Sequence, residues 1–325
     1  MPDSASSLAA QPSADPTTEH TSCPLCGSDA AHRVYRLADW LYGTEGWYCL
    51  VRCAACGLLY LNPRPSRDVM PCHYPSEYAP FQGAGAGRCL RRGPWRAYGL
   101  AKRCRAVTRL VPRGRLLDVG CASGAFLAAM RETGAWEVVG LERDEGAAAW
   151  ARERHGISVH RADVDEATFV EGAFDAITLW DVLEHLPSPG DTLRRLRPWL
   201  SDDGWLVLRV PDGGSPWARL FGRYWAGLDA PRHLVTFDRR TLRRLLSACG
   251  YTVRAEWALS GTHAMAVLSV TAWLRATGRR QGWVRLLNNP IAQALTAPLL
   301  WLTDRLLGGA LVTVAAQPTA TGDNA

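Results

Sequence analysis

From residue 95 onward, short apolar runs alternate with longer segments of helical periodicity. The runs are rich in Val, Ile, Leu and Trp and are bounded by polar or turn-forming residues, which is the pattern of buried strands. The predicted strands are Arg115–Val119, Trp136–Leu141, Ile157–His160, Phe174–Trp180, Trp205–Val210 and Tyr251–Trp257. Helical segments lie between most of them, and this alternation indicates an α/β fold with a doubly wound parallel sheet.

The first 94 residues follow a different pattern. Residues 1–20 are mainly Ala, Ser, Pro, Asp and Thr without periodicity, so we expect a disordered tail. Residues 21–62 carry two cysteine pairs separated by strand-like sequence. Residues 63–94 are rich in Pro, Gly and aromatic residues, and we interpret them as a linker. Apolar positions from Trp95 onward predict a helix that ends at Pro112.

Composition narrows the range of functions. The length of 325 residues predicts about two domains. The formal net charge of +6 permits contact with phosphates, anionic lipids or acidic substrates, but it also follows from an arginine-rich composition. Lys102 is the only lysine, which excludes the Gly-Lys-Ser/Thr loop of nucleoside triphosphatases. The chain begins without a secretion signal, so we expect a cytoplasmic protein whose ten cysteines are thiols or metal ligands.

Four of these cysteines have the spacing of a zinc site. Cys23 and Cys26 form one Cys-x-x-Cys-Gly pair, and Cys53 and Cys56 form the other. Four thiolates complete a tetrahedral zinc ion and leave no open position, so the metal would be structural. Iron is the competing metal, and independent thiols are the alternative without a metal. The other six cysteines have no paired spacing.

A Gly-rich turn follows the first strand of the second part. Asp118 closes that strand, and Gly120 and Gly124 would let backbone amides approach a ligand at a helix N-terminus. The Gly-x-Gly-x-x-Gly pattern of dinucleotide folds is absent, and a carboxylate here would attract a cationic ligand. Glu142 ends the next strand, where such folds bind a ribose diol, and Asp163 follows the third.

These residues resemble the class I methyltransferases that use S-adenosylmethionine, and the resemblance covers about residues 95–316. The family motif is Asp/Glu-x-Gly-x-Gly-x-Gly, and Ala122 replaces its middle glycine. The resemblance implies a Rossmann-like, mostly parallel sheet whose last strand, at residues 308–316, is antiparallel. It also implies cofactor contacts: Asp118 with the amino group, Gly120 and Gly124 along the backbone, Glu142 with the ribose, and Asp163 with Val164 at the adenine.

The segment after the fourth strand faces the transferred methyl group in that family. His185 is the candidate base, because an ordinary histidine pKa suits proton abstraction near neutral pH. Some relatives, notably quinone-precursor O-methyltransferases, bind a divalent cation there, which would involve Asp181 and Glu184 with His185. Alternatively, Glu184 and His185 only cap the next helix. His233 is a second candidate, either as a substrate contact or as a helix-entry residue.

The segment between Pro211 and Phe237 alternates aromatic and basic residues. It predicts either a lid over the acceptor or an amphipathic helix with a buried aromatic face. The residues concerned are Trp217, Phe221, Tyr224, Trp225, Arg219, Arg223 and Arg232.

Two apolar stretches near the C-terminus, Trp257–Leu274 and Leu286–Thr303, approach the length of a membrane span. Both contain polar residues or prolines that are costly in lipid. We interpret residues 258–308 as a helical insertion. Because arginines flank these stretches, a helix that lies on a membrane surface is an alternative, and with it peripheral membrane contact.

The sequence therefore predicts a small N-terminal zinc ribbon, over residues 21–62, followed by a methyltransferase domain over residues 95–325. The segment after Cys56 is similar to zinc ribbons that precede one branch of bacterial methyltransferases, many of which act on sugars or natural products. We expect methyl transfer to a small-molecule hydroxyl, as in a sugar or natural-product intermediate. An RNA methyltransferase and a non-catalytic scaffold are the alternatives. Nucleic acid is not the favoured partner, and the oligomeric state is left open.

Overall fold

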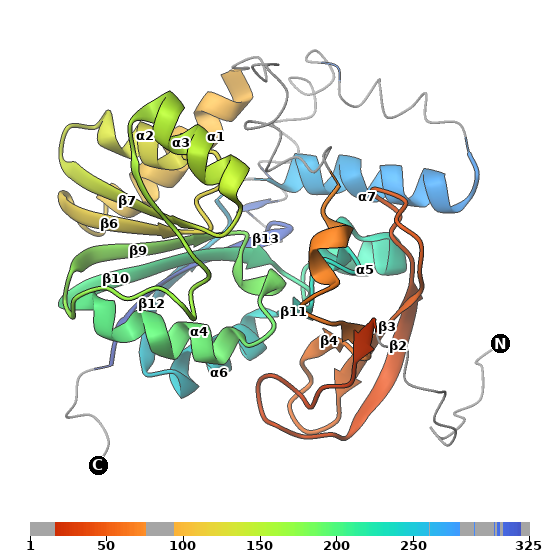
Figure 1. Cartoon of the computed structure of the whole chain (residues 1–325). Helices are drawn as coiled ribbons and strands as arrows, with labels where there is room; N and C mark the ends of the chain where they lie inside the picture. Colours follow the sequence, from red (N-terminus) through yellow and green to blue (C-terminus); the bar gives the residue numbers. More distant parts are fainter. Residues whose placement is uncertain are drawn as a thin grey trace.

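The computed structural model describes residues 17–75, 94–259, 261–279 and 308–319, together with positions 289, 302, 304 and 305. Most of the predicted tail, most of the predicted linker and the second apolar stretch therefore lie outside the described residues. Within them, the chain forms a large α/β domain and a smaller N-terminal module that lies against one end of it (Figure 1).

The large domain is built on a seven-stranded sheet with the order β12-β13-β10-β9-β6-β7-β8. Neighbouring strands from β10 to β8 are parallel, whereas β13 runs antiparallel to both β10 and β12. The expected Rossmann-like sheet with an antiparallel last strand is confirmed. The strands are β6 (Gly114–Val119), β7 (Trp136–Glu142), β8 (Ser158–Arg161), β9 (Phe174–Trp180), β10 (Leu200–Pro211), β12 (Tyr251–Trp257) and β13 (Leu311–Pro318).

The strand predictions fail mainly at the start of β10. This strand begins at Leu200, five positions before the predicted Trp205, and its register against β9 shifts between these two residues. Gly204 lies in the irregular stretch, where an added Cβ would approach the Ser201 carbonyl oxygen to 2.9 Å. The residues between Leu200 and Trp205 are mostly polar, because their side chains remain partly exposed. A search for apolar runs therefore does not find this part of the strand.

Helices cover both faces of the sheet (Figure 1). Helices α1 (Pro94–Thr108), α2 (Ala125–Arg131) and α3 (Glu145–His155) lie on one face, and α4 (Pro189–Leu196) and α6 (Arg239–Ala248) lie on the other. Helix α6 begins with a capping box in which the side chains of Asp238 and Thr241 satisfy each other's backbone amides. Helix α3 starts at the Asp144 cap and ends at Gly156, which adopts φ 60°.

A third group of elements connects the large domain to the N-terminal module. Helix α7 (Thr262–Ala276) packs on α5 (Pro216–Phe221) and on the short turns Gly222–Tyr224 and Ala226–Leu228.

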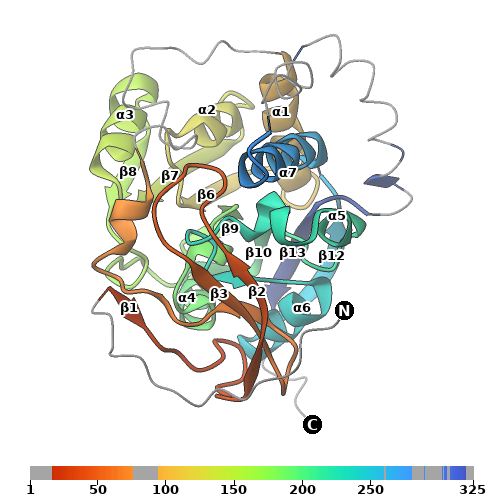
Figure 2. The same cartoon turned by 90° about the vertical axis from the view of Figure 1, so that its right-hand side faces the viewer.

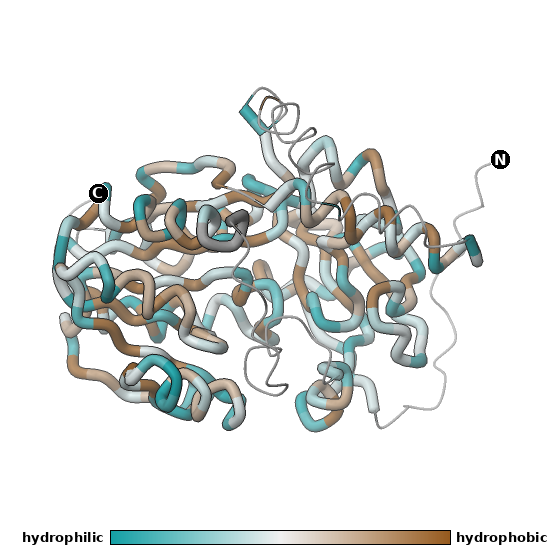
Figure 3. Tube along the Cα trace, turned by 90° about the horizontal axis from the view of Figure 1, so that it is seen from above, coloured by the Kyte–Doolittle hydropathy of each residue, from teal (hydrophilic) through white to brown (hydrophobic). Residues whose placement is uncertain are grey.

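Figure 3 shows that hydrophobic and hydrophilic colours alternate repeatedly along the tube. Among the described residues, no helix has both the length and the apolar character needed to cross a membrane.

The N-terminal module shares a sheet with the large domain. Strands β2 (Ala31–Leu37), β3 (Tyr48–Cys53) and β4 (Leu59–Leu61) form an antiparallel ribbon, and β11 (Val235–Thr236) of the large domain pairs with β4. In Figure 2, strands β2 and β3 lie in front of the large sheet.

The ordered module is longer than residues 21–62. In the predicted tail, β1 (Thr18–Glu19) pairs with β5 (Arg64–Pro65), which lies in the predicted linker. A 3-10 turn at Met70–His73 follows β5. The module therefore extends beyond both predicted boundaries. A short backbone pairing between distant segments leaves no recognisable sequence pattern in either segment.

Candidate active site

A cavity of about 1940 Å³ lies at the carboxyl ends of the parallel strands. Its floor is the point where the sheet order changes direction, between β6 and β9, which is where open α/β sheets bind their ligands. The cavity is lined by the following residues predicted to contact the cofactor: Asp118, Gly120, Glu142, Asp163 and Val164. The predicted catalytic residues His185 and His233 line the same cavity.

Asp118 is buried at the end of β6, and its Oδ1 accepts a hydrogen bond of 2.6 Å from the Thr178 hydroxyl. Burial raises the pKa of this carboxyl to about 7, although the Thr178 hydrogen bond opposes the shift. The charge of Arg103 also favours the ionised form, and a cationic ligand at this carboxyl would favour it further.

Glu142 is buried at the end of β7 and organises the Gly-rich turn. Its Oε2 accepts from the Ala122 amide at 2.8 Å, and its Oε1 accepts from the Asp144 amide at 2.9 Å. These bonds hold Ala122 at φ 46°, a left-handed conformation that is unfavourable for a residue other than glycine. The turn thus keeps the geometry of a glycine turn with alanine at its centre.

The two predicted glycines have different surroundings. Gly120 lines the cavity at φ 69°, and an added Cβ would lie 2.7 Å from Val182. Gly124 is not among the residues that line the cavity, and its contact with the cofactor backbone stays a prediction. It adopts φ 70° at the start of α2, and an added Cβ would lie 2.9 Å from Ala151. Gly124 is therefore needed for helix packing.

Asp163 lies at the edge of the cavity and is paired with a residue of the N-terminal module. Arg67 donates to Asp163 Oδ2 at 3.0 Å and to Asp165 Oδ2 at 2.8 Å. The Arg67 guanidinium and Asp165 are well exposed and Asp163 is partly exposed, so this contact contributes little to stability. It does place the module over the predicted adenine end of the cavity.

Asp181, at the end of β9, is held by arginines of two other elements. Arg209 of β10 donates its Nε to Asp181 Oδ1 at 2.8 Å, and Arg103 of α1 lies 3.3 Å from Oδ2. Burial alone would raise the pKa of Asp181, but the charges of Arg209 and Arg103 hold it below its usual value. Both oxygens therefore already have partners, so Asp181 is a poor metal ligand.

Glu184, His185 and His233 form a cluster at the acceptor side of the cavity. One ligand atom of each lies within 4.8 Å of the other two, and the imidazole centroids are 4.5 Å apart. The Glu184 carboxylate is buried, and neither oxygen accepts a hydrogen bond from the part of the chain that the structure describes. In the described structure the Glu184 side chain therefore does not cap helix α4, whose N-cap residue is Ser188.

Each imidazole is anchored through its Nδ1. His185 Nδ1 lies 3.0 Å from the Arg232 carbonyl oxygen, and His233 Nδ1 lies 2.8 Å from that of Gly227. A carbonyl oxygen only accepts, so an Nδ1–H donor leaves Nε2 as the basic nitrogen. Burial lowers the pKa of both histidines, and the charge of His233 adds to the effect at His185. Burial and the nearby Asp181 raise the pKa of Glu184.

The N-terminal module also lines this cavity, which the sequence did not indicate. Its contributions are Glu19, Leu41, Tyr42, Pro65, Arg67, Met70 and Tyr74. Tyr74 lies 3.2 Å from His185 Nδ1 through its hydroxyl, and burial raises its pKa to about 12. Tyr74-Pro75 followed by a Gly-rich segment reads as a loop, so no sequence signal identifies this tyrosine as a site residue.

The segment between Pro211 and Phe237 carries two alternative predictions, a lid over the acceptor and an amphipathic helix with a buried aromatic face. None of its Trp, Tyr, Phe or Arg side chains is among those that line the cavity in the described structure. Trp225 and Arg232 are buried, and Arg232 is paired with Asp39 and Asp229. The neighbouring Ala226, Asp229, His233 and Leu234 line the cavity instead.

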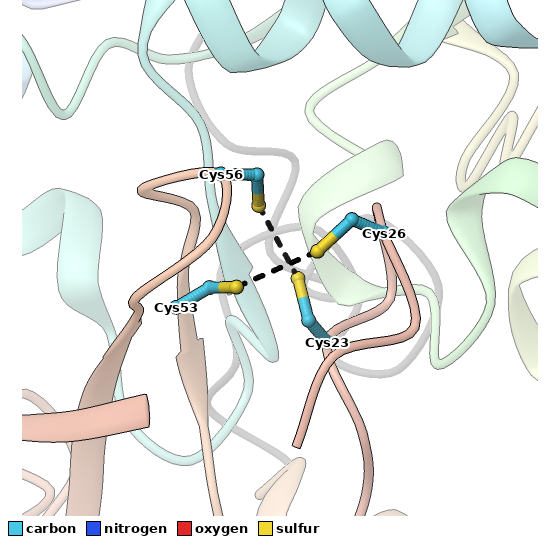
Figure 4. A group of neighbouring side chains, drawn as sticks. All are labelled: Cys23, Cys26, Cys53 and Cys56. Carbon is cyan, nitrogen blue, oxygen red and sulfur yellow. Dashed lines mark hydrogen bonds between the residues drawn. The ribbon is translucent and has the colours of Figure 1, made fainter. Parts of the chain in front are cut away.

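The four predicted zinc ligands converge at the tip of the module (Figure 4). The Cys23 and Cys56 sulfurs are 3.5 Å apart, as are those of Cys26 and Cys53. In tetrahedral zinc thiolate sites, Zn–S bonds of about 2.3 Å separate the sulfurs by slightly less than ~4 Å. Gly27 and Gly57 close the two turns at φ 73° and 83°. The donor set therefore fits one zinc ion.

The α/β fold, the cavity at the point where the strand order reverses, and the turn from Asp118 to Gly120 together define a site for a nucleotide-type cofactor. A family profile described as a methyltransferase domain matches residues 95–256. Residues 95–256 are therefore a methyltransferase domain, and together with the fold this match supports a class I S-adenosylmethionine-dependent enzyme.

The curated relatives match part of the chain. It is 33% identical over 99 residues to the ubiquinone biosynthesis O-methyltransferase of Bordetella avium, a match that covers 28% of this chain and 40% of the relative. The same enzyme of Pseudomonas aeruginosa is 30% identical over 113 residues, covering 33% of this chain and 48% of the relative. The matches thus span less than half of each relative.

Similar solved structures include a 1,6-didemethyltoxoflavin-N1-methyltransferase of Burkholderia thailandensis with bound S-adenosylhomocysteine. It is 16% identical, with a TM-score of 0.48, and the match covers 84% of this chain and 96% of that one. An S-adenosylmethionine-dependent methyltransferase of Mesorhizobium loti is 20% identical, with a TM-score of 0.47, covering 67% and 97% respectively.

Proposed function

We propose that the protein transfers the methyl group of S-adenosylmethionine to a hydroxyl group of a small molecule. The observation that carries this proposal is the single cavity that joins the Asp118–Gly120 turn to the Glu184, His185 and His233 cluster. A cofactor on the turn would present its methyl group toward basic side chains at the other end. The names of the curated relatives, which are O-methyltransferases, support an oxygen acceptor.

Residues at the cofactor end would hold the cofactor by charge and hydrogen bonding. Asp118 would accept from the ammonium group, Glu142 from the ribose hydroxyls, and Asp163 with Val164 would contact the adenine. Gly120 would leave room for close backbone approach. When bound, the cofactor supplies an electrophilic methyl group on a sulfonium.

The acceptor end would orient the hydroxyl and receive its proton. The acceptor oxygen forms a bond to the methyl carbon as the carbon–sulfur bond breaks, and S-adenosylhomocysteine leaves. The hydroxyl proton passes to His185 Nε2, which is basic because Nδ1–H points to a carbonyl. His233 and Glu184 would contact the acceptor beside it.

The surroundings of His185 favour an acidic hydroxyl. A pKa held below the usual histidine value makes His185 a weak base, and proton transfer is easier from a phenol or enol than from a sugar hydroxyl. Within the proposed class, this argument places an aromatic or enolic natural-product intermediate ahead of a sugar.

A divalent cation at the acceptor cluster is a second candidate for hydroxyl activation. Glu184 offers a buried carboxylate without hydrogen-bond donors among the described residues, and two imidazoles lie beside it. This donor set fits a divalent cation, which would polarise the acceptor oxygen and reverse the pKa shifts caused by burial. His233, rather than Asp181, would then complete the ligand set.

The first experiment is calorimetric titration of the full chain with S-adenosylmethionine and S-adenosylhomocysteine, together with metal analysis. We expect micromolar binding to the intact protein and loss of binding in Asp118→Asn. A folded protein that binds neither ligand would favour the scaffold alternative and contradict the proposed function.

The acceptor is then sought in a panel of phenols, enols, sugars and RNA. We expect methylation of a small-molecule hydroxyl, with a rate reduced in His185→Asn but not in the control His32→Asn, because His32 is exposed on β2. Methylation of RNA alone would contradict the proposed acceptor class. If the zinc-loaded protein retains a second metal ion and Glu184→Gln loses that ion, activation of the hydroxyl by a cation is favoured over activation by His185 alone.

A further inference from the structure

His185 has two partners at the same ring nitrogen, and both depend on the N-terminal module. The Arg232 carbonyl oxygen lies 3.0 Å from Nδ1, and the Tyr74 hydroxyl oxygen lies 3.2 Å from it. Tyr74 belongs to the segment that follows the ribbon. Arg232 belongs to the large domain, but its side chain is bound by Asp39 of the module.

These two partners favour different tautomers of the imidazole. A carbonyl oxygen can only accept, so the Arg232 contact requires a proton on Nδ1 and leaves Nε2 basic. A phenol hydroxyl can also donate, and a bond from Tyr74 to an unprotonated Nδ1 would place the ring proton on Nε2. Nε2 could then no longer accept a proton from the acceptor.

The position of the Arg232 carbonyl is set by a buried ionic network. The Arg232 guanidinium is fully buried and donates to Asp39 at 2.7 and 2.9 Å and to Asp229 at 2.6 and 3.0 Å. It also donates to the His73 carbonyl oxygen at 3.0 Å, and its charge lies 4.5 Å from the Tyr42 ring centroid. With each of its contacts made, the guanidinium has little freedom to move.

Asp39 is itself fixed by its own loop. Its carboxylate accepts from the backbone amides of Leu41, Tyr42 and Thr44 and from the Thr44 hydroxyl at 2.7 Å. The carboxylate therefore has a defined orientation. Its bidentate contact with Arg232 fixes the orientation of the guanidinium as well. The backbone that follows Arg232 is also tied down, because the Leu234 amide donates to the Glu184 carbonyl oxygen at 2.9 Å.

We propose that Asp39 is a positioning residue that holds the Arg232 carbonyl against His185 and so selects the tautomer with basic Nε2. Tyr74 is its competitor, which stabilises the other tautomer when the carbonyl moves away. The N-terminal module is then part of the acceptor site and determines the state of the base. This inference rests on the proposed function only for the role of His185 as a base; the tautomer selection stands on the contacts alone.

The test is the ¹⁵N imidazole spectrum of the full-length protein, which distinguishes Nδ1–H from Nε2–H. The protein has eight histidines, and the His185 signals are assigned by their loss in His185→Asn. We expect Nδ1–H in the parent protein and a shift toward Nε2–H in Asp39→Asn. The ratio of the two forms should change by about fivefold, which corresponds to one ordinary hydrogen bond.

A double variant separates tautomer selection from general loosening of the structure. Tyr74→Phe alone should keep Nδ1–H, because it removes only the competing partner. Asp39→Asn combined with Tyr74→Phe should recover Nδ1–H, because the carbonyl is then the remaining partner of Nδ1 in the described structure. The matched control is Arg64→Gln, which breaks another contact between module and domain, the 2.8 Å bond to the Pro187 carbonyl, without contact to His185.

The outcomes distinguish this inference from the proposed function. With an acceptor in hand, kcat should fall with the population of the Nδ1–H form while the cofactor Kd stays the same. An unchanged tautomer in folded Asp39→Asn, or the same change in Arg64→Gln, would overturn the inference. If the tautomer shifts as expected but His185→Asn methylates at the full rate, the positioning stands and the proposed base is wrong.

If Asp39→Asn does not fold, Asp229→Asn replaces it. Asp229 holds the same guanidinium from within the large domain, so the same shift toward Nε2–H is expected. Retention of the parent spectrum in that variant would count against the inference in the same way.

Discussion

The guanidinium of Arg232 and the carboxylate of Asp39 form a fully buried bidentate ion pair between residues 193 positions apart in the chain. Removing one partner of a buried pair typically costs about 3–5 kcal/mol, and when Asp39 is removed Asp229 still compensates part of the Arg232 charge. The pair joins the N-terminal module to the large domain directly beside the candidate base. We therefore expect the two parts to unfold together rather than separately.

Acid should weaken this connection. Burial by itself would raise the pKa of Asp39, but Arg232 and the loop donors lower it to about 2. A carboxyl whose folded pKa is below its unfolded value stabilises the protein above about pH 4. That contribution is about 2 kcal/mol and is lost as the pH falls from 4 to 2.

Urea unfolding at pH 5 and pH 3 measures this effect. The parent protein should lose more stability between the two pH values than Asp39→Asn does, because the variant has no carboxyl to protonate. Parallel losses in the two proteins would contradict the assignment.

Cofactor affinity should increase with pH near neutrality. Burial raises the pKa of Asp118 to about 7 in the ligand-free protein, whereas a bound ammonium group would favour the ionised carboxylate. Binding should therefore release a proton below pH 7, and affinity should rise between about pH 6 and pH 7.5. Calorimetry in two buffers of different ionisation enthalpy measures the released proton. Proton release that persists in Asp118→Asn would assign it to another group.

Loss of the cysteine cluster should lower metal content and stability together. Cys53→Ser should reduce zinc from about one ion per chain and lower the free energy of unfolding by more than about 3 kcal/mol. Cys49→Ser is the matched control, since Cys49 lies on the same strand but outside the cluster. Elemental analysis and thermal unfolding provide the two readouts. A Cys53 variant that keeps full zinc and stability would refute a four-cysteine site.

The central residue of the cofactor turn should tolerate, and benefit from, glycine. Ala122 adopts φ 46°, so Ala122→Gly should relieve strain and stabilise the protein by up to about 1 kcal/mol. Gly124→Ala makes the opposite change at φ 70° and meets Ala151, so it should destabilise by more than about 1 kcal/mol. Thermal unfolding compares the two. A destabilising Ala122→Gly would mean that the alanine methyl group makes packing contacts that outweigh the strain.

Much of the catalytic architecture was predictable from local patterns. Asp118, Glu142 and Asp163 come at the ends of successive apolar runs, and the carboxyl ends of parallel strands share one edge of a sheet. Once the strands were identified, their meeting in one cavity followed. The cysteine spacing was equally informative, because each pair closes its own turn and only two turns must approach each other.

The sequence was less informative where a side chain's role depends on distant segments. For Arg232 and Trp225 the sequence left both a lid and a buried position open, and the structure buries them against the module and the neighbouring turns. Asp39 and Tyr74 were not singled out, because an acid in a loop and a tyrosine before a proline are ordinary in sequence. Gly124 fitted the cofactor motif, but its environment is the packing of α2 against α3.

The sequence by itself determined the class of fold, the positions of most of its strands along the chain, the acid-glycine turn and the cysteine cluster. Each of these depends on periodicity or spacing within a short segment, where covalent geometry limits the alternatives. Only the tertiary structure decided that the N-terminal module forms a wall of the active site and that Arg232 connects Asp39 to His185. The contacts of Asp39 with Arg232 and of Tyr74 with His185 join residues more than a hundred positions apart, and burial converts charges that would be solvated in isolation into fixed partners.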